Sequence, residues 1–201
     1  MFDARLRPLI DPPLDRLAGS LARAGISADA ITWTALAIGL AGATAISAQY
    51  YLTGLSLFGM NRLLDGMDGA IARLTSPTDR GGFLDIVCDF LIYAAFPLAF
   101  AMADPLRNAL PAAGLLAGFI ASGATFLAFA AVAAKRGLST SAQGKKSIYY
   151  LAGLAEGAET IVAFVLMCVW PQYFPAIAYA FASICAVSAA ARIWSALQTL
   201  R

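Results

Sequence analysis

The stretch LLDGMDGAIARLTSPTDRGGFLDIVCDF, residues 63–90, places five aspartates among apolar runs long enough to cross a membrane. Four of these carboxylates lie inside or at the edge of such runs: Asp65, Asp68, Asp85 and Asp89. A charged side chain at the centre of a bilayer costs at least ~2.5–3.5 kcal/mol on insertion scales. The stretch therefore predicts two membrane helices that share a polar site.

The rest of the chain is equally apolar. Of its 201 residues 60% are hydrophobic and 13% are charged, about half the charged share of a soluble domain, which is about 25%. Roughly 20 apolar residues cross the hydrocarbon core, and six segments qualify: those near 31–49, 52–74, 81–102, 110–134, 147–170 and 174–197. We expect an all-α integral membrane protein, a single domain over 1–201 with a six-helix bundle across 31–197.

The positive charges predict the orientation, because cytoplasmic loops of membrane proteins carry the excess of Lys and Arg. With the N-terminus in the cytoplasm, Arg107 is the single basic loop residue on the other side. Both termini and the aspartates are then cytoplasmic, at what composition suggests is a bacterial inner membrane. Residues 1–25 are predicted to hold an interfacial amphipathic helix over 2–24; a disordered basic tail is the alternative.

Residue types that are missing or scattered exclude other chemistry. The chain has no histidine, which rules out histidine catalysis and histidine-ligated metals. Cys88, Cys168 and Cys185 lack the paired spacing of a zinc site or disulfide framework and are predicted to be packing residues. Nothing indicates a nucleic-acid partner.

The aspartates fall on two helical faces. At 100° per residue, Asp65 and Asp68 share an arc of about 140° with five neighbours: Asn61, Arg62, Gly69, Ala72 and Arg73. Asp85 and Asp89 share a face at i and i+4. The short connection 75–80 makes the two helices antiparallel neighbours, so four carboxylates are predicted to converge at their cytoplasmic end.

Divalent cations would resolve the repulsion between these carboxylates. Oxygen-only ligands suit Mg²⁺ or Mn²⁺, which also bind substrate phosphates, and two such ions form a clamp for in-line phosphoryl transfer. Gly69 and Ala72 leave room for a ligand to approach the backbone. The alternative is a structural salt-bridge network with the nearby arginines: Arg62, Arg73 and Arg80.

The order D-x-x-D-G-x-x-A-R, then Gly, then D-x-x-x-D resembles the signature of the CDP-alcohol phosphotransferase family. It is carried here by Asp65, Asp68, Gly69, Ala72, Arg73, Gly81, Asp85 and Asp89. The resemblance covers the whole chain and implies six membrane helices, an N-terminal cytoplasmic helix and a homodimer. The spacer between Arg73 and Gly81 is one residue shorter than usual, which leaves both helical faces in register and affects only the loop contact to the nucleotide.

The resemblance also implies roles. One metal ion would be bound by Asp65, Asp68 and Asp85, and a second by Asp65, Asp85 and Asp89. The CDP group would be contacted by Gly69, Ala72, Arg73, Thr78 and Gly81. Asp29 and Thr32, just before and in the first span, are further candidates for the cytidine site; helix capping by Ser27 or Asp29 is the alternative there.

The implied reaction moves a phosphatidyl group from CDP-diacylglycerol to an alcohol, with Asp89 as the base, and releases CMP. The enzyme would work among membrane lipids with two Mg²⁺ or Mn²⁺ ions. A CDP-alcohol donor with diacylglycerol as acceptor is the alternative, which the short chain disfavours. A cation channel or transporter is the alternative of another class; the gathering of the aspartates at one end argues against it.

The candidates for binding the acceptor alcohol are weaker: Lys135, Arg136, Glu156, Glu159 and Arg192. The two glutamates, at i and i+3 in GLAEGAETI, argue against an acceptor with its own phosphate and favour an amino group or polyol. For the basic loop residues the alternative is the positive-inside charge bias together with anionic lipids. For Arg192 the alternative is snorkelling to the membrane surface. For the glutamates it is a salt bridge to Arg62 or Arg192, or contacts within a dimer.

Overall fold

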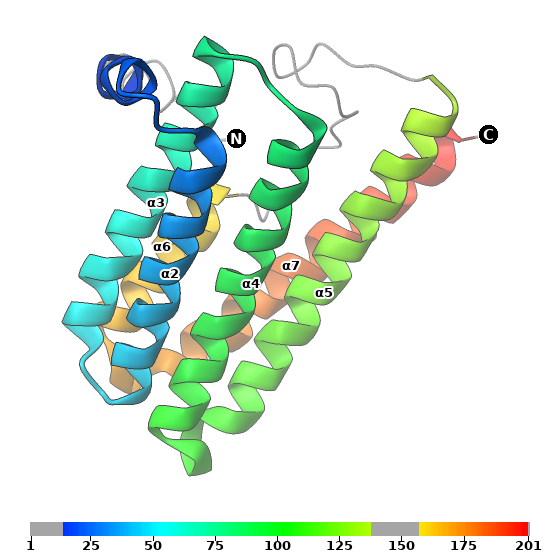
Figure 1. Cartoon of the computed structure of the whole chain (residues 1–201). Coiled ribbons are helices and arrows are strands. Elements are labelled where there is room, and N and C mark those ends of the chain that lie inside the picture. Colours follow the sequence, from blue (N-terminus) through cyan, green and yellow to red (C-terminus); the bar gives the residue numbers. More distant parts are fainter. Residues whose placement is uncertain (1–13, 138–156, 201) are drawn as a thin grey trace.

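The computed structural model of the chain describes residues 14–137 and 157–200, and all regular structure in those ranges is helical (Figure 1). Residues 14–23 form a first helical segment. The elements that follow are α2 (Ala28–Ser47), α3 (Tyr51–Leu74), α4 (Asp79–Ala103), α5 (Pro105–Lys135), α6 (Gly157–Val169), the 3₁₀ turn η1 (Pro171–Tyr173) and α7 (Phe174–Thr199). The predicted all-α class is confirmed.

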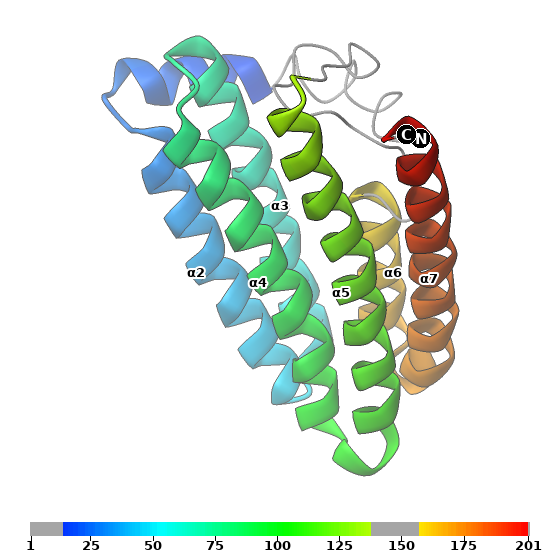
Figure 2. The ribbon, with the colours of Figure 1, turned by 90° about the vertical axis from the view of Figure 1, so that its right-hand side faces the viewer.

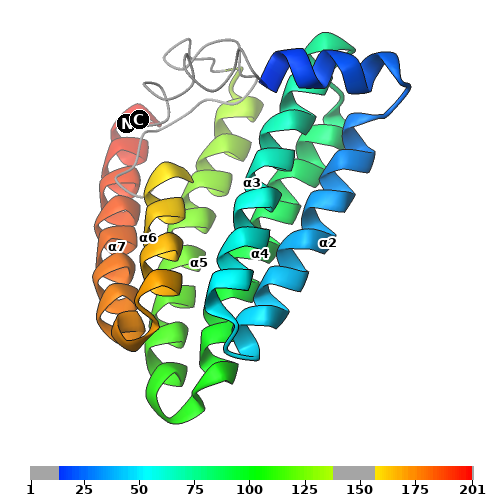
Figure 3. The same ribbon diagram turned by 90° about the vertical axis from the view of Figure 1, so that its left-hand side faces the viewer.

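The helices run side by side, and their connections alternate between two ends of the bundle (Figures 1 and 2). The α2–α3, α4–α5 and α6–α7 connections lie at one end. The α3–α4 connection and the last turns of α5 and α7 lie at the other, which we call the α3–α4 end. Segment 14–23 lies across this end (Figure 3), as an interfacial helix would, although residues 2–13 of the predicted amphipathic helix lie outside the described residues.

Within the described residues, four segments are long and apolar enough to cross a membrane: α2, α4, α5 and Pro171–Thr199. Helix α3 has 24 residues but carries the charged residues of the site. The described part of α6 has 13 residues, and positions 147–156 of the predicted fifth span lie outside the described ranges. The chain is thus a multi-pass helical protein, and the count of six spans stays a prediction.

Helix α5 starts earlier than the predicted boundary near residue 110. Asp104 is the N-cap, its carboxylate accepting a 3.2 Å hydrogen bond from the Arg107 backbone N–H, and Pro105 takes the first helical position. Proline suits that position because its missing N–H would have no partner there. Pro111 therefore lies inside the helix, although a proline in a sequence usually indicates the end of a helix or a kink in it.

Helix α2 packs against both α3 and α4. Small residues bring α2 and α3 together: a Cβ on Gly54 would clash with Ile46 and lie 3.0 Å from the Gly42 carbonyl oxygen. Membrane helices use small residues in this way to bring backbones close. The backbones of α3 and α4 approach each other much less closely, so these predicted neighbours meet through long side chains.

An aromatic layer lies below the α3–α4 end. Phe58 of α3 packs on Phe96 of α4, with ring centroids 4.8 Å apart, and Phe96 stacks on Phe164 of α6 at 5.0 Å. All three rings are buried. The layer ties three helices together and closes the polar end off from the apolar interior.

The three cysteines are free and buried, as predicted.

Candidate metal centre

Three carboxylates from α3 and α4 meet at the α3–α4 end. Asp65, Asp85 and Asp89 each offer a carboxylate oxygen, and these atoms lie within 4.8 Å of one another. Asp65 and Asp89 are half-buried and Asp85 is exposed. We call these three the carboxylate group. A divalent hard cation takes an all-oxygen ligand set of this kind and, with waters, completes its shell, so the residues present fit Mg²⁺ or Mn²⁺.

Asp68, the fourth predicted ligand, lies outside the carboxylate group. It is 5% exposed, and its Oδ2 accepts a 2.6 Å hydrogen bond from the Thr32 hydroxyl of α2. Thr32, a predicted cytidine contact, is buried as well. The structure therefore links these two predicted site residues to each other and brings α2 into the site.

Arg62, which the sequence placed on the aspartate face and in the salt-bridge alternative, is the arginine that contacts the carboxylate group. Its Nη1 donates a 2.6 Å hydrogen bond to Asp89 Oδ1 and lies 3.6 Å from Asp65 Oδ2. The other two arginines of the salt-bridge alternative pair elsewhere: Arg73 with Asp15 at 3.4 Å and Arg80 with Asp29 at 3.1 Å. By itself, Arg62 balances one of the three negative charges of the carboxylate group.

Predicted nucleotide contacts from two helix starts lie together beside this group. Thr78 caps α4 by accepting a 3.0 Å hydrogen bond from the Gly81 N–H, and a Cβ on Gly81 would lie 3.7 Å from Asp29 Oδ1. Ser27 supplies the N-cap of α2, so the capping alternative applies to Ser27. Asp29 instead pairs with Arg80, and its side chain is turned toward α4.

Gly69, Ala72 and Arg73 follow the aspartates on the last turns of α3. Among the described residues, a Cβ on Gly69 would meet the Arg73 guanidinium alone, at 3.5 Å. The partner of Arg73, Asp15, belongs to segment 14–23 and was not expected from the sequence. The two residues are far apart in the chain, so no local pattern signals their contact.

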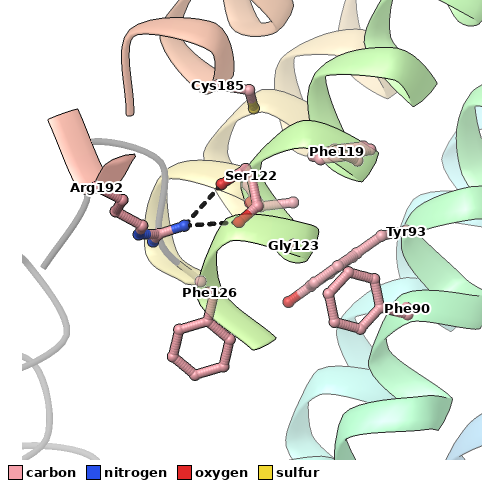
Figure 4. Close-up of a pocket in the computed structure, with 10 residues that line it drawn as sticks. Phe90, Tyr93, Phe119, Ser122, Gly123, Phe126, Cys185 and Arg192 are labelled. Carbon is pink, nitrogen blue, oxygen red and sulfur yellow. Dashed lines mark hydrogen bonds between the residues drawn. The ribbon is translucent and has the colours of Figure 1, made fainter. Parts of the chain in front are cut away.

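A separate cavity of about 160 Å³ lies among α4, α5, α6 and α7 (Figure 4). Arg192 of α7 lines it and is 6% exposed. The guanidinium donates to the Ser122 carbonyl and hydroxyl oxygens, at 3.0 and 2.9 Å, and lies 5.8 Å from the Phe126 ring centroid. Arg192 therefore does not snorkel to an open surface.

The other acceptor candidates lie at the ends of α5 and α6 or outside the described residues. Lys135 and Arg136 are exposed at the end of α5, and Arg136 donates a 2.8 Å hydrogen bond to the carbonyl oxygen of Leu200, the C-cap of α7. Glu159 is half-buried in the first turn of α6. Glu156 lies outside the described residues. Of the candidates within the described residues, Arg192 is the one that lines the cavity.

Known proteins resemble this chain in sequence, one of them over its whole length. Inner membrane protein YnjF of Escherichia coli K12 is 44% identical over 201 residues, covering 100% of this chain and 98% of that protein. An archaetidylinositol phosphate synthase of Pyrococcus horikoshii is 30% identical over 105 residues, covering 52% of this chain and 56% of the relative.

Solved structures share the fold. Phosphatidylinositol phosphate synthase (PgsA1) of Mycobacterium tuberculosis, in complex with manganese and citrate, is 21% identical with a TM-score of 0.73, over 92% of this chain and 88% of that one. The same enzyme with CDP-DAG bound is 20% identical with a TM-score of 0.71, over 91% of this chain and 92% of that one.

The sequence profile described as CDP-alcohol phosphatidyltransferase matches residues 25–194. The chain belongs to the CDP-alcohol phosphatidyltransferase family, as the motif predicted, and its reaction class is transfer of a phosphatidyl group from a CDP-linked donor to an alcohol. Its apolar helices are those of a multi-pass membrane protein, and the relative of 44% identity is an inner membrane protein.

Proposed function

We propose that the carboxylate group is the reaction centre at which this chain moves a phosphatidyl group from CDP-diacylglycerol to a small alcohol. The observation that carries the proposal is the meeting of three carboxylates from two helices, within 4.8 Å, at one end of an apolar bundle. Gathering carboxylates in this way is costly in a membrane protein, and a phosphate-binding cation site accounts for it.

Asp65, Asp85 and Asp89 would hold Mg²⁺ or Mn²⁺, with Asp68 completing the predicted pair of sites. When bound, two divalent cations stabilise the diphosphate and the charge that develops on the leaving CMP. The manganese in the similar synthase structure supports this assignment. Thr32 would orient Asp68 through the 2.6 Å hydrogen bond.

Asp89 would act as the base. Its carboxylate takes the proton of the acceptor hydroxyl, the oxygen bonds to the lipid-side phosphorus, and the bond from that phosphorus to the CMP oxygen breaks. A base has to lie within hydrogen-bond reach of the proton that it removes. Asp89 is half-buried beside the exposed Asp85, so it borders the open side of the group, where an acceptor would arrive.

The CDP group would lie across the last turns of α3 and the starts of α2 and α4. Support comes from the small residues at this place, which leave room for a ligand, and from the other predicted contacts around them. The small residues are Gly69, Ala72 and Gly81, and the other contacts are Arg73, Thr78 and Asp29. Arg73 is exposed and would exchange its exposed partner Asp15 for the nucleotide. An exposed pair of this kind contributes only ~0–1 kcal/mol, so the exchange costs little.

The acceptor would enter between the carboxylate group and the cavity that Arg192 lines. The glutamates of GLAEGAETI favour an amino alcohol or polyol, whereas the buried guanidinium suits an anionic group. We propose a small alcohol as the acceptor, and an assay with phosphorylated and unphosphorylated alcohols would decide whether it carries an anionic group. Replacing Arg192 by Gln should raise the KM for an anionic acceptor while leaving the KM for CDP-diacylglycerol unchanged.

For the membrane we propose six spans, an interfacial N-terminal helix, a homodimer, and both termini and the site in the cytoplasm. Arg107 lies at the end opposite the site and donates to the Gln172 carbonyl oxygen. The basic residues Arg73, Arg80, Lys135 and Arg136 belong to the α3–α4 end. This asymmetry supports the orientation under the positive-inside rule.

The deciding experiment measures CMP release and lipid products from the purified protein in detergent. CDP-diacylglycerol is offered with a panel of amino alcohols, polyols and their phosphates, in Mg²⁺, Mn²⁺ or EDTA. We expect metal-dependent CMP release with one acceptor class. Release from CDP-choline with diacylglycerol in place of that reaction would support the other donor, and no release with any pair would contradict the proposal.

A further inference from the structure

Arg62 lies on the floor of the carboxylate group. It precedes Asp65 by one helical turn on α3, which places it about 4.5 Å deeper in the bundle. Its side chain is 12% exposed. Below and beside it lie the rings of Phe58 and Tyr93, whose centroids are 5.7 and 5.8 Å from the guanidinium carbon. The guanidinium therefore separates three carboxylates from the aromatic layer.

The guanidinium is held by groups of α3 and α4, one of which is in turn held by α2. Its Nε donates a 2.8 Å hydrogen bond to Asn61 Oδ1. Asn61 is 2% exposed, and its amide donates 2.8 Å to the Ala35 carbonyl oxygen of α2. The ring of Tyr93 belongs to α4. A long side chain fixed in this way has already lost its rotamer freedom, so Arg62 is preorganised toward the carboxylates.

A single nitrogen of Arg62 faces two carboxylates. Nη1 is 2.6 Å from Asp89 Oδ1 and 3.6 Å from Asp65 Oδ2. Each of these carboxylates has two oxygens, one more than these contacts with Arg62 need. The arginine and a cation can therefore share the same carboxylates from opposite sides, with the arginine on the membrane side.

We infer that Arg62 is a positioning residue that holds the Asp89 carboxylate toward the reaction centre and serves as the built-in counter-ion of the carboxylate group. The inference rests on the proposed function in that the group is a cation site. Two consequences follow from the positive charge. It stabilises the protein when no cation is bound, and it repels an incoming cation, so binding is weaker than the carboxylates alone would make it.

The test uses Mn²⁺ alone as the probe, titrated by calorimetry into the detergent-purified chain and its Arg62→Gln variant. We expect the variant to bind Mn²⁺ at least about tenfold more tightly, equivalent to about 1.4 kcal/mol. In EDTA its Tm should be lower than that of the wild type. Arg107→Gln is the matched control at the other end of the bundle, and its Mn²⁺ affinity should stay within about twofold because distant sites act independently.

Arg62→Lys separates positioning from charge. Lysine keeps the positive charge but not the planar fork, so Mn²⁺ affinity should stay within about threefold of wild type while turnover falls at least about tenfold. Equal or weaker Mn²⁺ binding by Arg62→Gln overturns the inference. If that variant does not fold, unchanged turnover in Arg62→Lys overturns it. Absence of Mn²⁺ binding by the wild type would instead refute the cation site itself, and the inference with it.

Discussion

Replacing Asp89 by Asn should abolish phosphatidyl transfer and leave the protein folded. The substitution keeps the size of the side chain but removes its charge and its ability to take a proton. A positioned general base contributes about 10²–10⁴-fold to a rate, and Asp89 is also a proposed cation ligand. We therefore expect turnover to fall by at least about 100-fold.

The cost in stability should be small, and the structure sets its size. The hydrogen bond from Arg62 to Asp89 is 2.6 Å long, between side chains that are 12% and 28% exposed. Breaking a fully buried pair costs about 3–5 kcal/mol and an exposed one ~0–1 kcal/mol. Arg62 keeps Asp65 at 3.6 Å, and one carboxylate fewer relieves repulsion. We expect about 1–2 kcal/mol, a fall in Tm of roughly 2–8 °C.

The assay is CMP release with the acceptor found in the panel, alongside thermal unfolding in EDTA. Asp79→Asn is the matched control, because Asp79 is exposed in the first turn of the same helix and outside the proposed site. Its turnover should stay within about twofold of wild type, as expected for an independent surface position. Near-normal turnover in Asp89→Asn would show that the base has been assigned to the wrong carboxylate.

Two further substitutions test contacts of α2, one at the site and one at the opposite end of the bundle. Thr32→Val removes the donor to Asp68, a hydrogen bond to a charged group worth about 1.5–3 kcal/mol; CMP release should fall about tenfold, and equal behaviour of Thr34→Val, an exposed position on the same helix, would contradict the link. Gly54→Ala should lower the Tm by several degrees, because overpacking costs about 1–3 kcal/mol. Gly59→Ala, whose Cβ would meet nothing within 4 Å, should leave the Tm unchanged or raise it through helix propensity; a similar fall in both would argue against the close approach of α2 and α3.

Helix positions were predictable because apolar length and punctuation are local signals. The expected spans near 52–74 and 174–197 correspond to Tyr51–Leu74 and Phe174–Thr199. The later start expected for α5, near residue 110, has a local cause as well, since Asp104 caps the helix and Pro105 takes its first position. How α2 wedges against both α3 and α4 was not predictable, because it depends on glycines that meet across helices.

The core of the site was predictable for the same kind of reason. Asp65, Asp85 and Asp89 lie on helical faces that spacing alone defines, and a short connection forces the two helices to run antiparallel. Asp68 shares the spacing of Asp65, but its orientation depends on Thr32, which is 36 positions away in the chain. No periodicity encodes a hydrogen bond over that separation.

The sequence by itself determined the class of the protein, its apolar helices, and the face on which its carboxylates gather, because these follow from hydropathy and from helical periodicity. Only the tertiary structure decided which partners those carboxylates have. Arg62 is drawn to Asp89 by a fold that buries it between aromatic rings, while Arg73 and Arg80 pair with aspartates of other segments. Those choices arise from burial and charge in three dimensions, where residues from separate helices share one low-dielectric space.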